Sequence, residues 1–228
     1  MKSTRLLIFL IFIIPFTGAA QSLSRVTSGV DLGLGYKDKA WVPSIMYHQN
    51  LSLSNFSWFQ IGWGVRTWAY YAGRTDLAPK DNLLSGGDTL KFGKVTTNGI
   101  SFLVGATVKL WKFDIGANTD LIGVAFGVRR RGLYTKSSSV EGEGAEFYNA
   151  YVPSSPTPLN AVPLFLNNNN GQSEVFLRYW ITPRVGIKVG YVHGRISYTA
   201  TEKLDNGQKR FSTTYGVPYA ALAFPLYN

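Results

Sequence analysis

The feature that most constrains the fold of this chain is a strict alternation of apolar and polar side chains over unusually long stretches. It is clearest in WFQIGWGVRTWAYYAG, residues 58–73. The odd positions of this stretch are apolar almost throughout, whereas the even positions mix glycine, amide, guanidinium and aromatic groups. Because successive side chains of a β-strand point to opposite faces, the pattern predicts one long strand with an apolar face and a mixed face. An ordinary strand has about 5–6 residues, so the apolar face must meet either the core of a large sheet or lipid.

Seven further stretches show the same alternation, which brings the expected number of strands to about eight. They are residues 25–36, 41–53, 99–110, 113–128, 174–181, 185–191 and 210–227. In the stretch 113–128 the apolar positions change phase, and a single-residue bulge near Leu121 and Ile122 would reset the alternation. In the last stretch we expect the apolar face to consist of Phe211, Tyr215, Val217, Tyr219 and Ala221.

The connections between these strands differ in length in a regular way. Three are short turns, near SNFS, LWKF and TPR, and they alternate with longer connections at residues 73–94, 129–173 and 201–209. One further connection on the long-loop side, YKDK, is also short. Short turns on one side and long loops on the other are typical of outer-membrane barrels. The connections therefore favour a membrane barrel over a soluble barrel or sandwich, and the longest of them has room for a small hairpin of its own.

The N-terminus, MKSTRLLIFLIFIIPFTGAAQS, has the pattern of a secretory signal peptide. Basic residues precede an apolar run at residues 6–16, and small residues allow cleavage after Ala20. The alternative is a membrane-anchor helix, for which this run is short. We therefore expect a signal peptide at residues 1–20 and an outer-membrane β-barrel domain at residues 21–228. The chain has no cysteine, which excludes a lipoprotein anchor and a disulfide framework.

The phase of each strand predicts which side chains face the interior of such a barrel. The ionisable residues expected inside are Asp31, Arg66, Lys109, Asp114, Asp120, Arg178 and Lys188. Both signs of charge occur among them, and a buried charge is costly unless it is paired. We therefore expect an interior that is plugged by paired charges rather than an open pore.

Ring-bearing side chains divide between the two faces. Those expected inside, next to small glycines, are Trp58, Trp68 and Trp180. Those expected outside, near strand ends at the head-group boundary, are Tyr36, Trp41, Phe59, Tyr71, Tyr191 and Phe211. The expected fold is thus all-β, a closed antiparallel up-and-down transmembrane β-barrel of about eight strands.

The whole pattern of signal, alternating strands, tight turns and long loops resembles the small bacterial outer-membrane β-barrel proteins of the OmpA transmembrane-domain and OmpX type, among the porin-family barrels. The resemblance implies a location in the bacterial outer membrane, and the even number of strands, with the short turns on the periplasmic side, predicts that both termini are periplasmic. The resemblance also implies a monomer whose partners are the lipid bilayer and the outer-membrane assembly machinery.

The expected function is structural or one of surface interaction, with a narrow channel or ligand conduit and a lipid-A-modifying enzyme as the alternatives. His48 and His193 are the only histidines and stand in no local nucleophile motif, so we do not expect an enzyme. The sequence also shows no cofactor or metal motif.

The formal net charge is +10, or +8 without Lys2 and Arg5. The densest basic cluster, Arg129, Arg130 and Arg131, is a candidate contact for anionic lipid, including lipopolysaccharide. Nucleic acid is not expected as a partner, because an exported chain rarely meets it.

Overall fold

The structure, a computed structural model, describes residues 26–54, 56–79, 88–136, 146–161, 169–205 and 207–227. The expected signal peptide at residues 1–20 lies outside them. Within the described residues the secondary structure is made of strands and turns, and no helix there is long and apolar enough to cross a bilayer. All strand pairings among these residues are antiparallel, which confirms the all-β, antiparallel part of the prediction.

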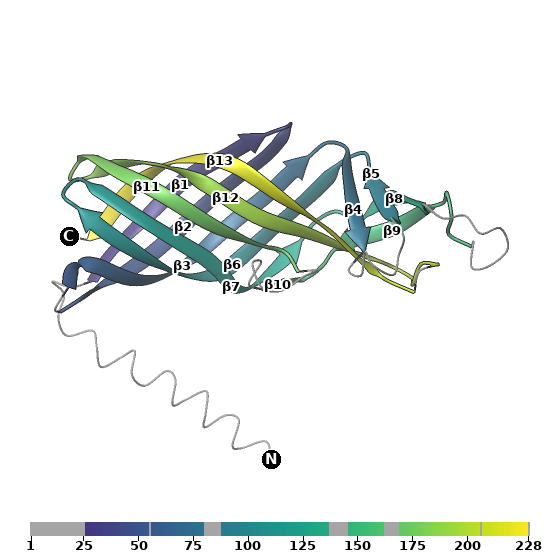
Figure 1. The fold of residues 1–228 in the computed structure, drawn as a ribbon, viewed down its shortest axis with the longest axis horizontal. Coiled ribbons are helices and arrows are strands. Elements are labelled where there is room, and N and C mark those ends of the chain that lie inside the picture. Colours follow the sequence, from purple (N-terminus) through teal and green to yellow (C-terminus); the bar gives the residue numbers. More distant parts are fainter. Residues whose placement is uncertain are drawn as a thin grey trace, which may run out of the picture.

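Eight strands of 12–18 residues form the main body. They are β1 (Val26–Lys37), β2 (Ala40–Leu53), β3 (Phe56–Ala72), β6 (Val95–Leu110), β7 (Phe113–Phe126), β11 (Gly171–Thr182), β12 (Val185–Ala200) and β13 (Arg210–Tyr227). Each pairs with the next in chain order, and β13 pairs back onto β1. The eight long strands therefore close into a ring around a common axis (Figure 1).

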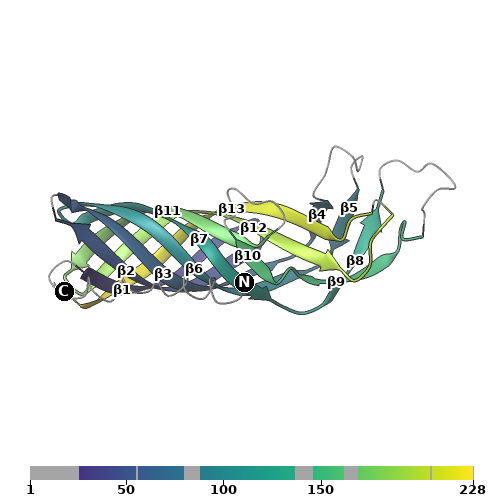
Figure 2. The same ribbon diagram turned by 90° about the horizontal axis from the view of Figure 1, so that it is seen from below.

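Five short strands lie in the longer connections. They are β4 (Thr75–Pro79), β5 (Thr89–Phe92), β8 (Arg130–Thr135), β9 (Tyr151–Pro156) and β10 (Leu159–Ala161). Four of them form a second cycle with the ends of β12 and β13, in the order β13, β4, β5, β8, β9 and β12. This cycle extends the molecule beyond the main ring (Figure 2). The described chain thus has thirteen strands, so the predicted count of about eight is too low.

The molecule has two different ends. The β2–β3, β6–β7 and β11–β12 connections lie at one end of the molecule, together with the C-terminus, and we call it the turn end (Figure 1). The other end, the loop end, carries the tight 38–39 turn and the connections that contain the short strands. The hairpin expected within the longest connection is present as β8 paired with β9.

The predicted bulge in β7 is confirmed. Phe102 of β6 pairs with Ile122, whereas the next residue, Leu103, pairs with Asp120, so Leu121 has no direct partner in this pairing. The bulge places Leu121 and Ile122 on the outer face together, where both are exposed. Asp120, just before the bulge, is fully buried in phase with Asp114 and Asn118, and after the bulge the inward positions are odd-numbered, as the burial of Ala125 shows.

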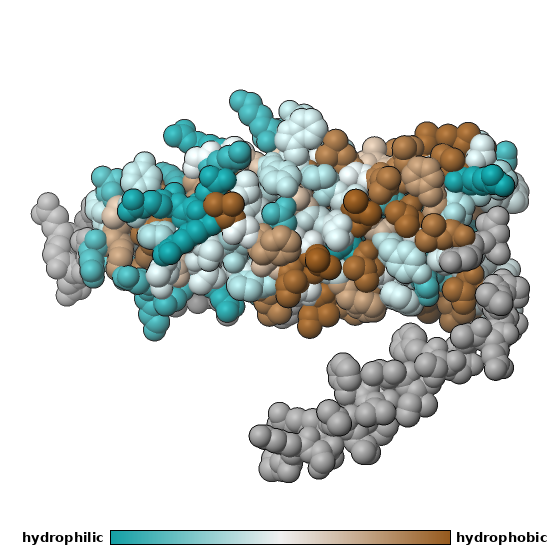
Figure 3. Space-filling view, turned by 180° about the vertical axis from the view of Figure 1, so that it is seen from behind, coloured by the Kyte–Doolittle hydropathy of each residue, from teal (hydrophilic) through white to brown (hydrophobic). Residues whose placement is uncertain are grey.

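Apolar side chains cover the outside of the main ring. The exposed ones include residues from all eight long strands, such as Leu32, Ile45, Ile61, Ile100, Ile115, Val175, Ile187 and Leu222. Figure 3 shows that hydrophobic residues gather over the half with the turn end and hydrophilic residues over the half with the loop end. The arrangement is inside-out relative to a soluble protein, because large apolar side chains face outward all around the ring.

The last strand contradicts its predicted phase. The residues expected outside on β13, including Phe211, Tyr215 and Tyr219, are buried in the interior, while Leu222 is exposed. The reason is a second apolar core inside the loop-end half, which the apolar face of β13 joins. One prediction at the other end is also wrong: Trp58 is half exposed, because β3 there has passed beyond the buried part of the ring.

The core of the loop-end half collects side chains from long and short strands alike. Its fully buried members include Leu77, Leu90, Phe92, Tyr134, Ile196, Tyr198 and Phe211. The rings of Phe92 and Tyr198 lie 5.0 Å apart between centroids. The interior therefore has an apolar level near the loop end, whereas its charged side chains gather nearer the turn end.

Candidate functional site

Asp31 of β1 lies at the centre of the buried charged side chains in the interior. Its side chain is fully buried, and its Oδ2 accepts hydrogen bonds from Arg178 Nη2 at 2.8 Å and from Lys188 Nζ at 2.9 Å. Arg178 lies on β11 and Lys188 on β12, and neither strand pairs with β1. These ion pairs therefore cross the interior rather than follow the wall.

A second set of ion pairs continues from Lys188 toward β3. Lys188 Nζ lies 2.7 Å from Glu174 Oε1, and Glu174 Oε2 lies 3.7 Å from Arg66 Nη2. The other guanidinium nitrogen, Arg66 Nη1, lies 3.8 Å from Asp120 Oδ1. All four side chains are almost completely buried. The cations of three strands are thus linked through carboxylates into one network.

Amide side chains fill the spaces between these charges. Arg66 donates hydrogen bonds to Gln172 Oε1, at 3.3 Å, and to Asn118 Oδ1. Asn118 Nδ2 in turn donates to Glu174 Oε2 at 3.0 Å, and the backbone N–H of Gln172 donates to Asp120 Oδ2 at 3.0 Å. These donors satisfy carboxylate oxygens that would otherwise be buried without a partner.

The network ends at a polar cavity of about 220 Å³ near the turn end. At its wall, Asp114 Oδ2 accepts hydrogen bonds from Trp180 Nε1 at 2.8 Å and from Arg178 Nη1 at 3.4 Å. His48 Nε2 lies 3.5 Å from Asp31 Oδ1. Lys109, which is half-buried, also lines the cavity.

The charges of the network nearly balance. Its buried cations are Arg66, Arg178 and Lys188, and its buried carboxylates are Asp31, Asp114, Asp120 and Glu174. Aromatic faces add to the environment of the cations, since Lys188 Nζ lies 4.5 Å from the centre of the Phe176 ring. This arrangement can hold strands together across the interior, and the apolar core above it closes the loop-end side.

The structure buries six of the seven ionisable residues that the sequence assigned to the interior, and leaves only Lys109 half-buried. It brings Asp31, Arg66, Asp114, Asp120, Arg178 and Lys188 into one network. Sequence reasoning missed Glu174, although the signal was present. Glu174 lies four residues before Arg178 on the same alternating face of β11.

The basic cluster lies apart from this network, where the chain leaves β7 and enters β8 near the loop end. Arg129 and Arg131 are exposed and Arg130 is half-buried. Arg129 Nη2 donates a hydrogen bond to Thr201 Oγ1 at 2.7 Å. Two guanidinium groups of the cluster are therefore accessible to partners outside the molecule.

The histidines do not form a nucleophile–base pair with a serine among the described contacts. The ring of His48 contacts Arg178, Asp31 and Asn50, with Nδ1 3.3 Å from Asn50 Nδ2. His193 is half-buried. Within the described residues, no group of three or more metal-ligating side chains could hold a metal ion.

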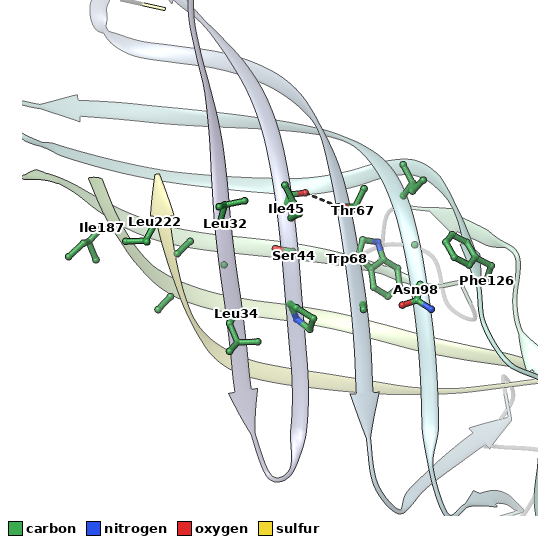
Figure 4. Close-up of a pocket in the computed structure, with 17 residues that line it drawn as sticks. Leu32, Leu34, Ser44, Ile45, Thr67, Trp68, Asn98, Phe126, Ile187 and Leu222 are labelled. Carbon is green, nitrogen blue, oxygen red and sulfur yellow. Dashed lines mark hydrogen bonds between the residues drawn. The ribbon is translucent and has the colours of Figure 1, made fainter. Parts of the chain in front are cut away.

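The outer face of the ring carries a shallow groove of about 920 Å³ across neighbouring strands (Figure 4). Leu32, Ile45 and Thr67 stand side by side along it, because their strands pair in register. The lining is mostly apolar and includes no charged side chain, so the groove is suited to contact with hydrocarbon.

No family model matches the chain, and no curated protein matches it. Solved structures to which it is similar include Neisserial surface protein A (NspA), with 11% identity, a TM-score of 0.37, and coverage of 87% of this chain and 94% of that chain. Ail, the attachment invasion locus protein of Yersinia pestis, was solved with the heparin analogue sucrose octasulfate. It shows 10% identity, a TM-score of 0.35, and coverage of 89% and 97%.

A major outer membrane protein from Thermus thermophilus shows 10% identity, a TM-score of 0.39, and coverage of 88% and 99%. These proteins are small outer-membrane β-barrels, the class that the sequence resembles. Because these TM-scores are below 0.5, the role of this chain is inferred from its own contacts and not from these structures.

Proposed function

We propose that the protein is an integral outer-membrane β-barrel with a closed interior, whose loop-end half serves surface interaction. The observation that carries this proposal is the inside-out distribution of side chains. Large apolar side chains face outward around the ring of eight long strands, and ionised side chains are paired inside it. The hydrocarbon of a bilayer stabilises a protein with an apolar outer surface, and closure of the ring pairs the backbone of every ring strand within the lipid.

The two ends suggest the orientation of the barrel. Outer-membrane barrels place short turns in the periplasm and long connections outside the cell. The turn end, with the C-terminus, would then face the periplasm, and so would the start of β1. A spanning strand needs about 9–11 residues, whereas the long strands here have 12–18 residues. The excess length carries the loop-end half beyond the hydrocarbon.

Surface interaction follows from how the loop-end half is built. Its interior is filled by an apolar core, so this half is a solid projection rather than a funnel. Its outer surface carries exposed cations, including Arg129, Arg131, Lys203 and Lys209. Positive charge next to an outer leaflet of phosphorylated glycolipid attracts the lipid head groups. The partners we propose are therefore the bilayer and lipopolysaccharide, with the assembly machinery inserting a monomeric barrel.

Membrane fractionation combined with gel mobility tests the placement. The protein should sediment with outer membranes, and the unboiled sample should migrate differently from the boiled sample because a folded barrel resists the detergent. A mature chain that is monodisperse in buffer without detergent and does not bind liposomes would overturn the proposal.

Two alternatives have their own measurements. A narrow channel predicts stepwise conductance in planar bilayers, whereas the filled interior predicts none. A lipid-A-modifying enzyme predicts that replacing His48 with Gln and His193 with Gln changes the lipid-A mass spectrum of the host. We expect no change, because His48 already contacts buried members of the charged network.

A further inference from the structure

The wall of the molecule is interrupted between β1 and β4, beside β13. The pairing of β13 with β1 ends at Tyr219, opposite Gly35, and its pairing with β4 begins at Ser212, opposite Ala78. Between these points the edge of β13 that faces away from β12, residues 213–218, pairs with no strand of the described chain. Figure 1 shows that β13 extends farther toward the loop end than the β1–β2 hairpin does. We call this interruption the lateral window.

The connectivity gives the lateral window a frame. On the side toward the turn end, the border of the lateral window is the 38–39 turn. One flank is β13 and the other is the end of β3. On the side toward the loop end, the chain crosses from β3 to β4, which pairs with β13 and completes the border. Six residues of strand span about 20 Å, and the three strand spacings from β13 to β3 span about 14 Å at the base. The frame is large enough for a head group rather than only for water.

A cavity of about 580 Å³ opens at the lateral window. Behind it stand Tyr70 and Tyr215, which are buried and whose ring centroids are 4.6 Å apart. Both rings belong to the apolar core that fills the loop-end half. The lateral window is therefore a blind site in the wall and not the mouth of a channel.

Exposed charges line the rim, with cations in excess. The cations are Lys37, Lys39 and Arg74, and the carboxylates are Asp38 and Asp76. Asp76 is also opposite Lys91 in the pairing of β4 with β5, which offsets its charge. The rim thus favours an anion, and Arg74 supplies a planar guanidinium suited to phosphate oxygens.

The position of the lateral window indicates where that anion would come from. Immediately below the rim, the exposed rings of Tyr36 and Trp41 pack with centroids 4.5 Å apart. Aromatic rings of this kind mark the boundary between hydrocarbon and head groups. The lateral window therefore opens sideways at the level of the outer leaflet's head groups.

We propose that the lateral window binds the phosphorylated head group of an outer-leaflet lipid. The phosphate lies against Lys37, Lys39 and Arg74, while the acyl chains stay on the apolar outer face below. This inference rests on the proposed membrane placement and specifies which surface of the loop-end half takes part in lipid contact.

Native mass spectrometry of the folded, detergent-solubilised chain tests the proposal. The probes are bisphosphorylated lipid A, the same lipid after removal of its phosphates, and inorganic phosphate as a soluble competitor. The window variant combines Lys37→Gln, Lys39→Asn and Arg74→Gln, and its matched control combines Lys112→Gln, Lys136→Gln and Arg184→Gln, which lie away from the lateral window and also remove three positive charges. We expect the window variant to bind bisphosphorylated lipid A at least about tenfold more weakly, and the control to change less than about twofold.

A second comparison uses Arg129→Gln with Arg131→Gln, which removes charge at the basic cluster instead. Equal losses in all variants, or a loss confined to the basic cluster, would overturn the proposal. So would equal binding of the dephosphorylated lipid. Displacement of the lipid by millimolar inorganic phosphate would reassign the site to a free anion.

Failure of the membrane placement is a separate outcome. It would appear as a chain that neither sediments with membranes nor shows heat-dependent gel mobility, whatever its lipid binding.

Discussion

Asp31 illustrates how single residues of the interior depend on one another. Two cations, Arg178 and Lys188, donate to its Oδ2, and all three side chains are almost without solvent contact. Replacing Asp31 with Asn removes the carboxylate that Arg178 and Lys188 share, so that Arg178 keeps only Asp114 and Lys188 keeps only Glu174 as a charged partner. Breaking a buried pair in this way costs about 3–5 kcal/mol. We expect a loss of that order in the free energy of unfolding, measured by urea titration of the folded barrel in lipid.

The matched control for this variant is Glu202→Gln, because Glu202 is exposed at the loop end. Its effect should stay within about 0.5 kcal/mol. The loss in the double variant Asp31→Asn with Lys188→Met should be smaller than the sum of the two single losses, because both changes remove the same ion pair. Losses that add in full would contradict the pairing.

Gly33 shows why small residues recur on the inner face. A methyl group at Gly33 would overlap the ring of Tyr219, whose hydroxyl lies 2.7 Å from Ser44 Oγ. Overpacking of this kind costs about 1–3 kcal/mol. We therefore expect Gly33→Ala to lower the urea midpoint, while Gly93→Ala, where a methyl group meets nothing within 4 Å, leaves it unchanged. A similar loss at both glycines would place the effect in the backbone rather than in the ring contact.

Alternation in the sequence predicts the face of a residue but not its depth. Asp31 and Lys188 could be assigned to the interior because their neighbours on the opposite face are apolar. The same reasoning placed Lys109 inside, where it is only half-buried, because it lies near the turn that ends β6. Which cation meets which carboxylate could not be predicted, since those contacts join strands distant in the sequence.

The turn between β1 and β2 carries strain of its own. Asp38 and Lys39 have φ angles of 51° and 65°, in the left-handed region. Two-residue hairpin turns of this conformation prefer Asn-Gly, because the left-handed region is costly for residues with a Cβ. We expect Asp38→Asn with Lys39→Gly to raise the free energy of unfolding by about 1 kcal/mol.

The control for the turn is Lys37→Gly, because Lys37 is the last residue of β1 and needs no left-handed conformation. Glycine there should lower stability by about 0.5–1 kcal/mol. If Asp38→Asn with Lys39→Gly lowers stability too, the turn conformation is not the source of the strain.

The elements differ in how far the sequence could predict them. The bulge in β7 followed from a phase change within one strand, so it was visible locally. The inward direction of the apolar face of β13 was not visible locally, because apolar residues alternate along the sequence in the same way whether they face lipid or an apolar core. That core is built by β4, β5, β8 and β9, whose 4–6 residues are too few to show a period.

On the scale of the whole molecule, the two halves distribute polar and apolar side chains in opposite ways. The turn-end half has a charged interior and an apolar outside, whereas the loop-end half has an apolar interior and a hydrophilic outside (Figure 3). The long strands β12 and β13 run through both halves and pair with each other along most of their length. The loop-end half is therefore built around an apolar core, as a soluble domain is, and it continues from a ring whose apolar side chains face outward.

This division predicts that the loop-end half can be destabilised alone. Phe92 of β5 is buried in the apolar core, away from the ion pairs, so Phe92→Ala should cost about 3–5 kcal/mol of packing in that half only. In proteoliposomes we expect rapid proteolysis of the loop-end connections, while heat-dependent gel mobility persists, because β5 is not one of the eight ring strands. The control, Tyr151→Ala, removes an exposed ring of β9 and should leave proteolysis unchanged. Simultaneous loss of protease resistance and gel mobility in Phe92→Ala would mean that the two cores fold as one unit.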